Sequence, residues 1–156
     1  MSKQDFLTDE SISVLRRLLG VSVHTIYTPR LDVAAAHLAA WKLAFSIKKD
    51  FFVNVSCEWS ETPRFLNDFW LITVSESSDP IGIRRNESGA LIEPCTISMY
   101  HAQPIRRIEI FEYCDSSDGE DKESVQYDQA ILFRCAEERN FCVACMPNGP
   151  GISEYL

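Results

Sequence analysis

The stretch WKLAFSIKKDFFVNVSCEW, residues 41–59, decides the fold class. Apolar side chains alternate with polar or small ones over residues 41–48, and a second alternation begins at Phe51 and runs to Trp59. A period of two indicates a strand with one buried face, because successive side chains of a strand point to opposite faces. Lys-Lys-Asp between the two halves turns the chain. We therefore predict a β-hairpin of residues 40–48 and 51–59.

Toward the N-terminus the period changes to that of a helix. Ile12, Leu15 and Leu19 share one stripe, Thr8 is a suitable N-cap, and Gly20 is a suitable stop. We predict a helix over residues 9–19. The alanine-rich stretch 30–40 stays ambiguous between helix and strand.

Toward the C-terminus the pattern predicts further strands. They are FWLITVS (69–75), TISMY (96–100), IRRIEIFEY (105–113), QAILFRCA (129–136) and NFCVACM (140–146). The last two form a second hairpin, in which we expect Ile131 to face Cys145, Phe133 to face Val143, and Cys135 to face Phe141. Residues 60–68 are predicted to be a polar loop in which Pro63 opens one helical turn, and the tail after residue 146 to be partly loose.

These elements predict an α+β fold. Most connections between strands are too short for a helical crossover, so the sheet should be mostly antiparallel. We expect about seven strands with the N-terminal helix packed on them, in one domain spanning residues 1–156.

The bulk composition restricts the partners. The chain has 156 residues and a net charge of −8, which argues against general affinity for nucleic acid or for an anionic membrane. A basic protein partner is compatible with that charge, and self-association stays open. The sequence shows no targeting segment and no apolar run of membrane-spanning length, so we expect a cytoplasmic protein.

The six cysteines include a Cys-x-x-Cys pair, Cys142 and Cys145. On a strand, residues three apart point to opposite faces, so the two thiols could not share one zinc ion. A thioredoxin-like pair opens a helix, and Pro147 follows too soon for one. We expect these cysteines to be small core residues in a reducing compartment, with no metal, no cofactor and no disulfide.

Catalytic signatures are missing from the sequence. There is no nucleophile elbow, no phosphate-binding glycine loop and no zinc-protease motif. Cys95 and His101 lie about 20 Å apart on an extended strand, too far for a nucleophile–base pair. An enzyme is therefore the less favoured class, unless distant residues assemble its site.

Two acidic stretches are candidate binding surfaces. The loop CDSSDGEDKES (114–124) fails as a calcium loop, because Cys114 stands where the first ligand carboxylate is needed. It is either a solvated loop or a contact for a cationic partner. The stretch 57–70 combines tryptophan and phenylalanine with acids, as interface centres do, although Trp59, Phe69 and Trp70 would equally pack inward. The predicted partner-binding residues are Asp115, Asp118, Glu120, Asp121, Glu123, Glu58 and Glu61.

The hairpin YDQAILFRCAEERNFCVAC (127–145) follows PIRRIEIFEY (104–113) and LIEPCTISMY (91–100). This order of strands resembles small bacterial α+β proteins of toxin–immunity clusters over about residues 40–150. The resemblance implies a cytosolic inhibitor that binds a toxin domain, often a basic nuclease, and it assigns no functional residue. The alternative is a small enzyme or ligand-binding protein.

Overall fold

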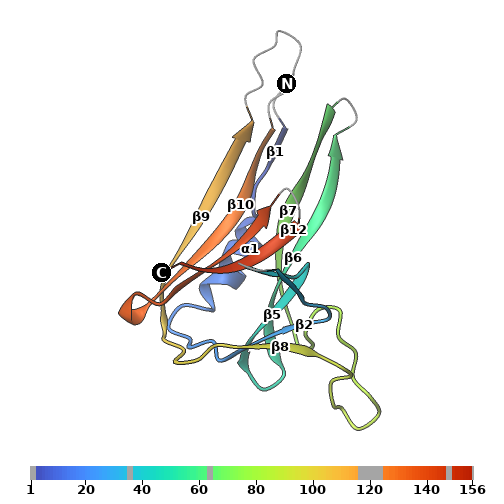
Figure 1. The fold of residues 1–156 in the computed structure, drawn as a ribbon, viewed down its shortest axis with the longest axis vertical. Coiled ribbons are helices and arrows are strands. Elements are labelled where there is room, and N and C mark those ends of the chain that lie inside the picture. Colours follow the sequence, from blue (N-terminus) through green and yellow to red (C-terminus); the bar gives the residue numbers. More distant parts are fainter. Residues whose placement is uncertain (1–2, 35–36, 63–64, 116–124, 147–148, 156) are drawn as a thin grey trace.

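The computed structural model describes residues 3–34, 37–62, 65–115, 125–146 and 149–155. Two sheets face each other, and one short helix lies beside them (Figure 1). The seven-stranded sheet contains β1 (Lys3–Asp5), β3 (Asp32–Ala34), β4 (His37–Ala39), β9 (Ile105–Asp115), β10 (Val125–Cys135), β11 (Asn140–Met146) and β12 (Gly149–Tyr155). The five-stranded sheet contains β2 (Thr25–Thr28), β5 (Lys42–Lys48), β6 (Phe51–Thr62), β7 (Phe65–Ser77) and β8 (Cys95–Ser98).

The prediction of a mostly antiparallel sheet with a helix packed on it is confirmed. The predicted hairpin of residues 40–48 and 51–59 is the β5–β6 pair, with Asp50 at a positive φ of 54° in its turn. The described ladders are antiparallel except for β1, which pairs with β10 in parallel. The structure describes more strands than the expected seven, and they form two sheets. The alternation of apolar residues along a strand does not indicate which sheet the strand joins, so the sequence could not predict this division.

Helix α1 (Asp9–Arg16) begins where the sequence predicts it. The hydroxyl of Thr8 accepts a hydrogen bond from the backbone N–H of Ser11, as an N-cap does. The helix ends three residues earlier than expected. Gly20, at a φ of 81°, donates its N–H to the carbonyl of Ile105 in β9 instead of continuing the helix. In the part of the chain that the structure describes, no helix is long and apolar enough to cross a membrane.

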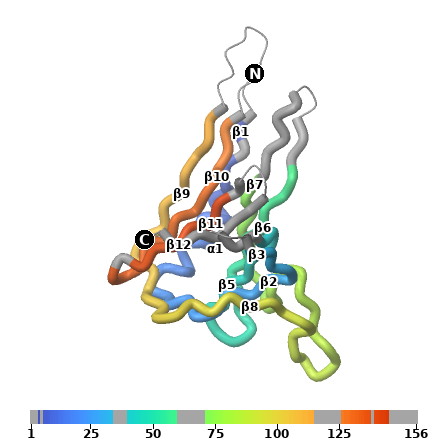
Figure 2. Tube along the Cα trace, viewed as in Figure 1, coloured from blue at the N-terminus to red at the C-terminus, as the bar shows by residue number. Residues whose placement is uncertain are grey.

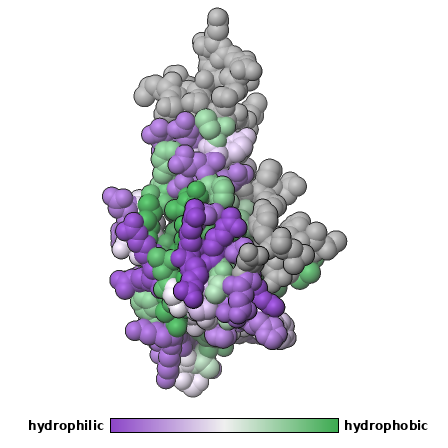
Figure 3. Space-filling model, turned by 90° about the vertical axis from the view of Figure 1, so that its left-hand side faces the viewer, coloured by the Kyte–Doolittle hydropathy of each residue, from purple (hydrophilic) through white to green (hydrophobic). Residues whose placement is uncertain are grey.

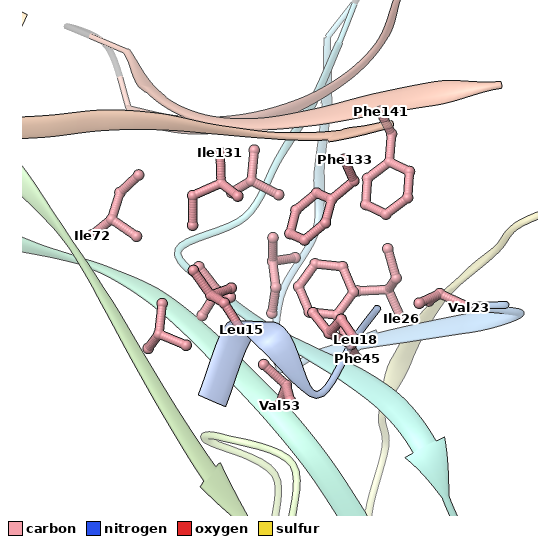
Figure 4. Close-up of a cluster of buried hydrophobic side chains, with 14 of the residues drawn as sticks. Leu15, Leu18, Val23, Ile26, Phe45, Val53, Ile72, Ile131, Phe133 and Phe141 are labelled. Atoms are coloured by element: carbon pink, nitrogen blue, oxygen red, sulfur yellow. The ribbon is translucent and has the colours of Figure 1, made fainter. Parts of the chain in front are cut away.

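The core lies between the two sheets (Figure 4). Phe45 of the smaller sheet meets Phe133 and Phe141 of the larger one, at centroid distances of 5.5 and 6.1 Å. Leu15 and Leu18, in and just after α1, enter the same cluster (Figure 4). All five side chains are at most 2% exposed, so each sheet buries its inner face against the other.

The second hairpin exists, but its predicted register is wrong by two residues. Ile131 faces Val143 and Phe133 faces Phe141. A shift of two keeps the same side chains on the same face, and these four are buried in the core as expected. The turn is centred one residue earlier than assumed, at Glu137, which has a positive φ of 59°.

Two expected loops are strands. Part of the predicted polar loop 60–68 belongs to β6 and β7, which pair from Phe52–Ser77 out to Thr62–Phe65. The proposed helical turn at Pro63 lies outside the described residues. The tail forms β12, which pairs along the whole of β11 and also with β4. Pairing with a neighbouring strand outweighs the turn residues of the tail. The ambiguous stretch 30–40 contributes β3 and β4 to the same sheet.

Candidate functional site

Two long hairpins extend beyond the core at the same end of the molecule (Figures 1 and 2). One is β6–β7 and the other is β9–β10, whose ladder runs from Ile105–Cys135 out to Asp115–Val125. They belong to different sheets. The two acidic stretches that the sequence singles out, residues 57–70 and 114–124, therefore connect to the same end of the fold, although 43 residues separate them in the chain.

The predicted partner-binding residues fall into two groups. Glu58 is exposed on β6, while Glu61 and Asp115 lie on β6 and β9 near the ends of their hairpins. Asp118, Glu120, Asp121 and Glu123 lie outside the described residues. The structure thus places one of the predicted carboxylates on the surface and puts two further positions on the hairpin arms.

Trp59 lies on the inner side of β6, past the end of the core. It follows Val53, Val55 and Cys57 in the alternation, yet it is 48% exposed whereas those three are 8% exposed or less. The interpretation that Trp59 packs inward is wrong for this reason: the strand continues beyond the opposite sheet's cover. A half-exposed tryptophan beside the exposed Glu58 is the residue type that dominates binding energy in many protein interfaces.

The outer face of β9 and β10 carries a charged cluster. Glu109 accepts from Arg107 of its own strand at 2.9 Å and from Arg134 of β10 at 3.2 Å. This carboxylate is only 19% exposed, and two guanidinium groups compensate its charge. The cluster therefore links neighbouring side chains on the surface of the sheet. Because one carboxylate pairs with two guanidinium groups, the cluster carries a net positive charge on an acidic protein.

Aromatic side chains continue this face toward the hairpin end. Phe111 and Tyr113 of β9 are 48% and 41% exposed. Tyr113 contacts Tyr127 of β10 across the ladder, with ring centroids 5.3 Å apart. The sequence contains a signal for this surface that we did not use: in IFEY (110–113), Ile110 and Phe111 are adjacent, so apolar groups occur on both faces of the strand.

A polar cleft separates α1 from β7. Its volume is about 470 Å³. The hydroxyl of Ser11 donates to the carbonyl of Val74 at 3.2 Å, and Arg17 pairs with Glu76 at 2.7 Å. Its lining combines two acids, one arginine and three serines with two valines: Glu10, Ser11, Ser13, Val14, Arg17, Val74, Ser75 and Glu76. Such a lining could hydrogen-bond a small polar molecule, but it holds no cysteine or histidine nucleophile.

The cysteines form no site in the described structure. Among the described residues, no group of three or more histidine, cysteine, aspartate or glutamate side chains could hold a metal ion. Cys142 is buried, and desolvation raises the pKa of its thiol and of the Cys135 thiol above the ordinary value. Burial therefore favours the protonated thiol of both residues, which is the less reactive form.

The prediction of no disulfide is wrong for Cys57. This residue is disulfide-bonded, while Cys95, Cys114, Cys135 and Cys142 are free. The argument from strand alternation compares thiols within one strand. It does not address which cysteines the packing of two sheets brings together, and Cys57 lies on the inner face of β6.

Comparison with protein-family models, with curated proteins and with solved structures finds no match for the chain.

Proposed function

We propose that this chain is a protein-binding protein that uses the end of the molecule bearing the β6–β7 and β9–β10 hairpins. One observation carries the proposal: hairpins from two different sheets, each leading to an acidic stretch, extend past the core on the same side (Figure 1). The exposed aromatic side chains on the two arms are available for contact with another protein. Trp59 beside Glu58 on one arm, and Phe111 and Tyr113 on the other, supply apolar anchors.

The partner that fits this end is a basic protein domain. The chain carries a net charge of −8, and the 115–123 segment contains five carboxylates and one lysine. Long-range attraction of that kind accelerates association more than it strengthens the final complex. Within this class, an immunity-type inhibitor of a toxin domain, as the resemblance implies, is the most specific version.

Site-specific photo-cross-linking tests the proposal. A photo-reactive phenylalanine analogue at position 59 should capture a partner in the cells that produce the chain. The same analogue at position 100 is the control, because Tyr100 is the more exposed aromatic residue, at 85%, and follows β8 at the opposite end (Figure 1). A partner captured from position 100 but not from position 59 contradicts the proposed surface.

The captured partner then allows a kinetic test of the charge argument. Neutralising Asp115, Asp118, Glu120, Asp121 and Glu123 to the amides should slow association and reduce its salt dependence, and leave dissociation nearly unchanged. An association rate that this change leaves unaltered contradicts the role of the acidic segment. Rescue of cell growth, when the captured partner is expressed alone and then with this chain, separates toxin inhibition from other binding.

A second candidate function rests on the cleft between α1 and β7. A small enzyme or ligand-binding protein would use Arg17 and the serines that line it to hold a polar small molecule. Replacing Ser13 with Trp would fill part of the cleft without touching the hairpin end. If partner capture at position 59 persists in this variant while a small molecule found by thermal-shift screening no longer binds, the two functions are separate.

A further inference from the structure

β9 has an unpaired long edge. Among the described strands it pairs with β10 alone, and it is eleven residues long. At its start, the backbone N–H and C=O of Ile105 bond to Val21 and Gly20, on the side away from β10. After that point, the ladders of the described residues give β9 no partner on this side. A long unpaired edge is a template for another strand.

The structure indicates which backbone groups this edge offers. The Ile105 side chain faces the core, and its backbone groups point away from β10. Along one strand, residues whose side chains lie on the same face also direct their backbone N–H and C=O groups to the same edge of the strand. Ile108 and Ile110 also pack against the core, so their N–H and C=O groups point to the same free edge.

The sequence along this edge is apolar at its centre and opposite in charge at its ends. Ile108 and Ile110 flank Glu109, with two arginines before them and Phe111 and Glu112 after them. Arg106 and Glu112 are exposed, and within the described structure neither forms an ion pair. Figure 3, which faces the β9 side, shows hydrophobic surface bordered by hydrophilic residues. When a second copy of this strand runs antiparallel to the first, the arginine end of each copy lies opposite the glutamate end of the other.

We propose that β9 pairs with β9 of a second copy of this chain, antiparallel and centred on Glu109. In this register Arg106 of each copy lies opposite Glu112 of the other, and Ile108 lies opposite Ile110. Arg107 lies opposite Phe111, where a guanidinium can stack on the ring. The two Glu109 carboxylates meet at the centre, and the arginines that already hold each one offset their repulsion. Gly20 and Val21 already occupy the edge at Ile105, so the paired segment runs only from Arg106 to Glu112 of each copy. Over this segment the two larger sheets become continuous.

The order of charges favours a second copy over a foreign strand. A partner strand would have to match both ends and the apolar centre, and β9 itself does so when reversed. β9 contains no proline, and its edge charges, which would repel many foreign strands, complement one another when a second β9 runs antiparallel. The interface shares Phe111 with the proposed partner surface but does not include Trp59, so charge changes at Arg106 and Glu112 and cross-linking at position 59 test the two proposals at different residues.

A charge-swap experiment tests the register. Analytical ultracentrifugation over a concentration series should show a monomer–dimer equilibrium for the wild-type chain. Arg106→Glu makes both ends of β9 acidic and Glu112→Arg makes both ends basic, so each variant alone should dimerise about tenfold more weakly or worse. An equimolar mixture should restore dimers, because every pair across the interface is then complementary.

Matched controls separate the interface from general charge and from folding. Arg84→Glu and Glu87→Arg make the same charge changes at exposed positions outside β9, and should leave the dimer unchanged. At a concentration low enough that every form is monomeric, thermal unfolding should be the same for all four variants, since their side chains are exposed. A wild-type chain that stays monomeric, a variant that dimerises as well as wild type, or a mixture that stays monomeric overturns the proposal.

Discussion

The body of the sandwich and its extended arms follow the same strand pattern with different results. Along β6, Val53, Val55 and Cys57 are buried, and Trp59, the next residue on that face, is half exposed. Along β9, Ile110 packs against the core from the inner face, and the next residue, Phe111, lies on the outer face and is 48% exposed. The sequence pattern of a strand shows only which of its faces are apolar. Whether an apolar face is buried depends on whether another part of the fold covers it.

This difference should appear most strongly when two phenylalanines are compared. Phe133→Ala removes a ring that is 0% exposed and contacts both Phe45 and Phe141, so we expect a loss of about 3–5 kcal/mol in the free energy of unfolding. Phe111→Ala on the exposed arm should cost less than about 0.5 kcal/mol. Urea unfolding of both variants checks this. Equal losses would mean that the arm contributes to the core after all.

A second prediction concerns the attachment of the N-terminal segment to the larger sheet. Asp128 is 6% exposed, and its carboxylate accepts from the backbone N–H of Leu7 at 2.6 Å. Asp128→Ala leaves that N–H without its acceptor, and should reduce the free energy of unfolding by about 1–3 kcal/mol.

Two matched variants show whether the hydrogen bond causes that loss. Asp128→Asn keeps an oxygen that can accept, so it should cost less than the alanine. Asp32→Ala removes a carboxylate whose ion pair with Arg30 lies at the surface, and should cost at most about 1 kcal/mol. If Asp128→Asn and Asp128→Ala have equal effects, the acceptor is not what matters.

The cap of α1 should give a smaller effect. Thr8→Ala removes the side-chain acceptor of the Ser11 N–H, and should cost about 1 kcal/mol in the urea-unfolding free energy. Thr8→Ser keeps the hydroxyl and should stay close to the wild type. A Thr8→Ser variant as unstable as Thr8→Ala would point to the methyl group, not to the cap.

The smallest effect should come from the buried thiols at alkaline pH. Burial raises the pKa of the Cys142 thiol, so the folded chain holds that proton more tightly than the unfolded chain does. Its contribution to stability is complete below the ordinary thiol pKa and is lost as the pH rises from there through the raised value. The stability difference between wild type and Cys142→Ala should therefore shrink between pH 8 and pH 10, about the range of ordinary thiol titration.

Cys114 serves as the control for the burial of Cys142, because it is exposed. A thiol reagent should modify Cys114 well before Cys142 in the native protein. A Cys142 that reacts as fast as Cys114 would show that burial does not protect it.

Much of the fold could be predicted from local patterns. The two hairpins, the start of α1 at Thr8 and the inward faces of Ile131 and Phe133 all follow from alternation and capping. The extra strands could not be predicted. β1, β3 and β4 are three residues each, and β12 contains two glycines and a proline, so their strand conformation depends on neighbours distant in sequence.

The candidate site was only partly predictable, for a related reason. Acidic composition pointed to residues 115–123, and tryptophan and acids pointed to 58–70, but no local pattern says that these segments extend at the same end. The exposure of Trp59, the cleft beside α1 and the disulfide of Cys57 all depend on how one sheet is placed over the other. Each is a property of packing between distant segments.

The parallel pairing of β1 with β10 has a consequence for the order of assembly. Lys3–Asp5 pair with Val125–Tyr127, so the first strand of the chain has no ladder to join until more than 120 residues have followed it. The hairpins of the smaller sheet connect neighbouring segments and can form early, because closing a short loop costs little entropy. During synthesis on a ribosome, β1 would thus remain unpaired until β10 is made. The larger sheet, which contains both strands, would close after the smaller one.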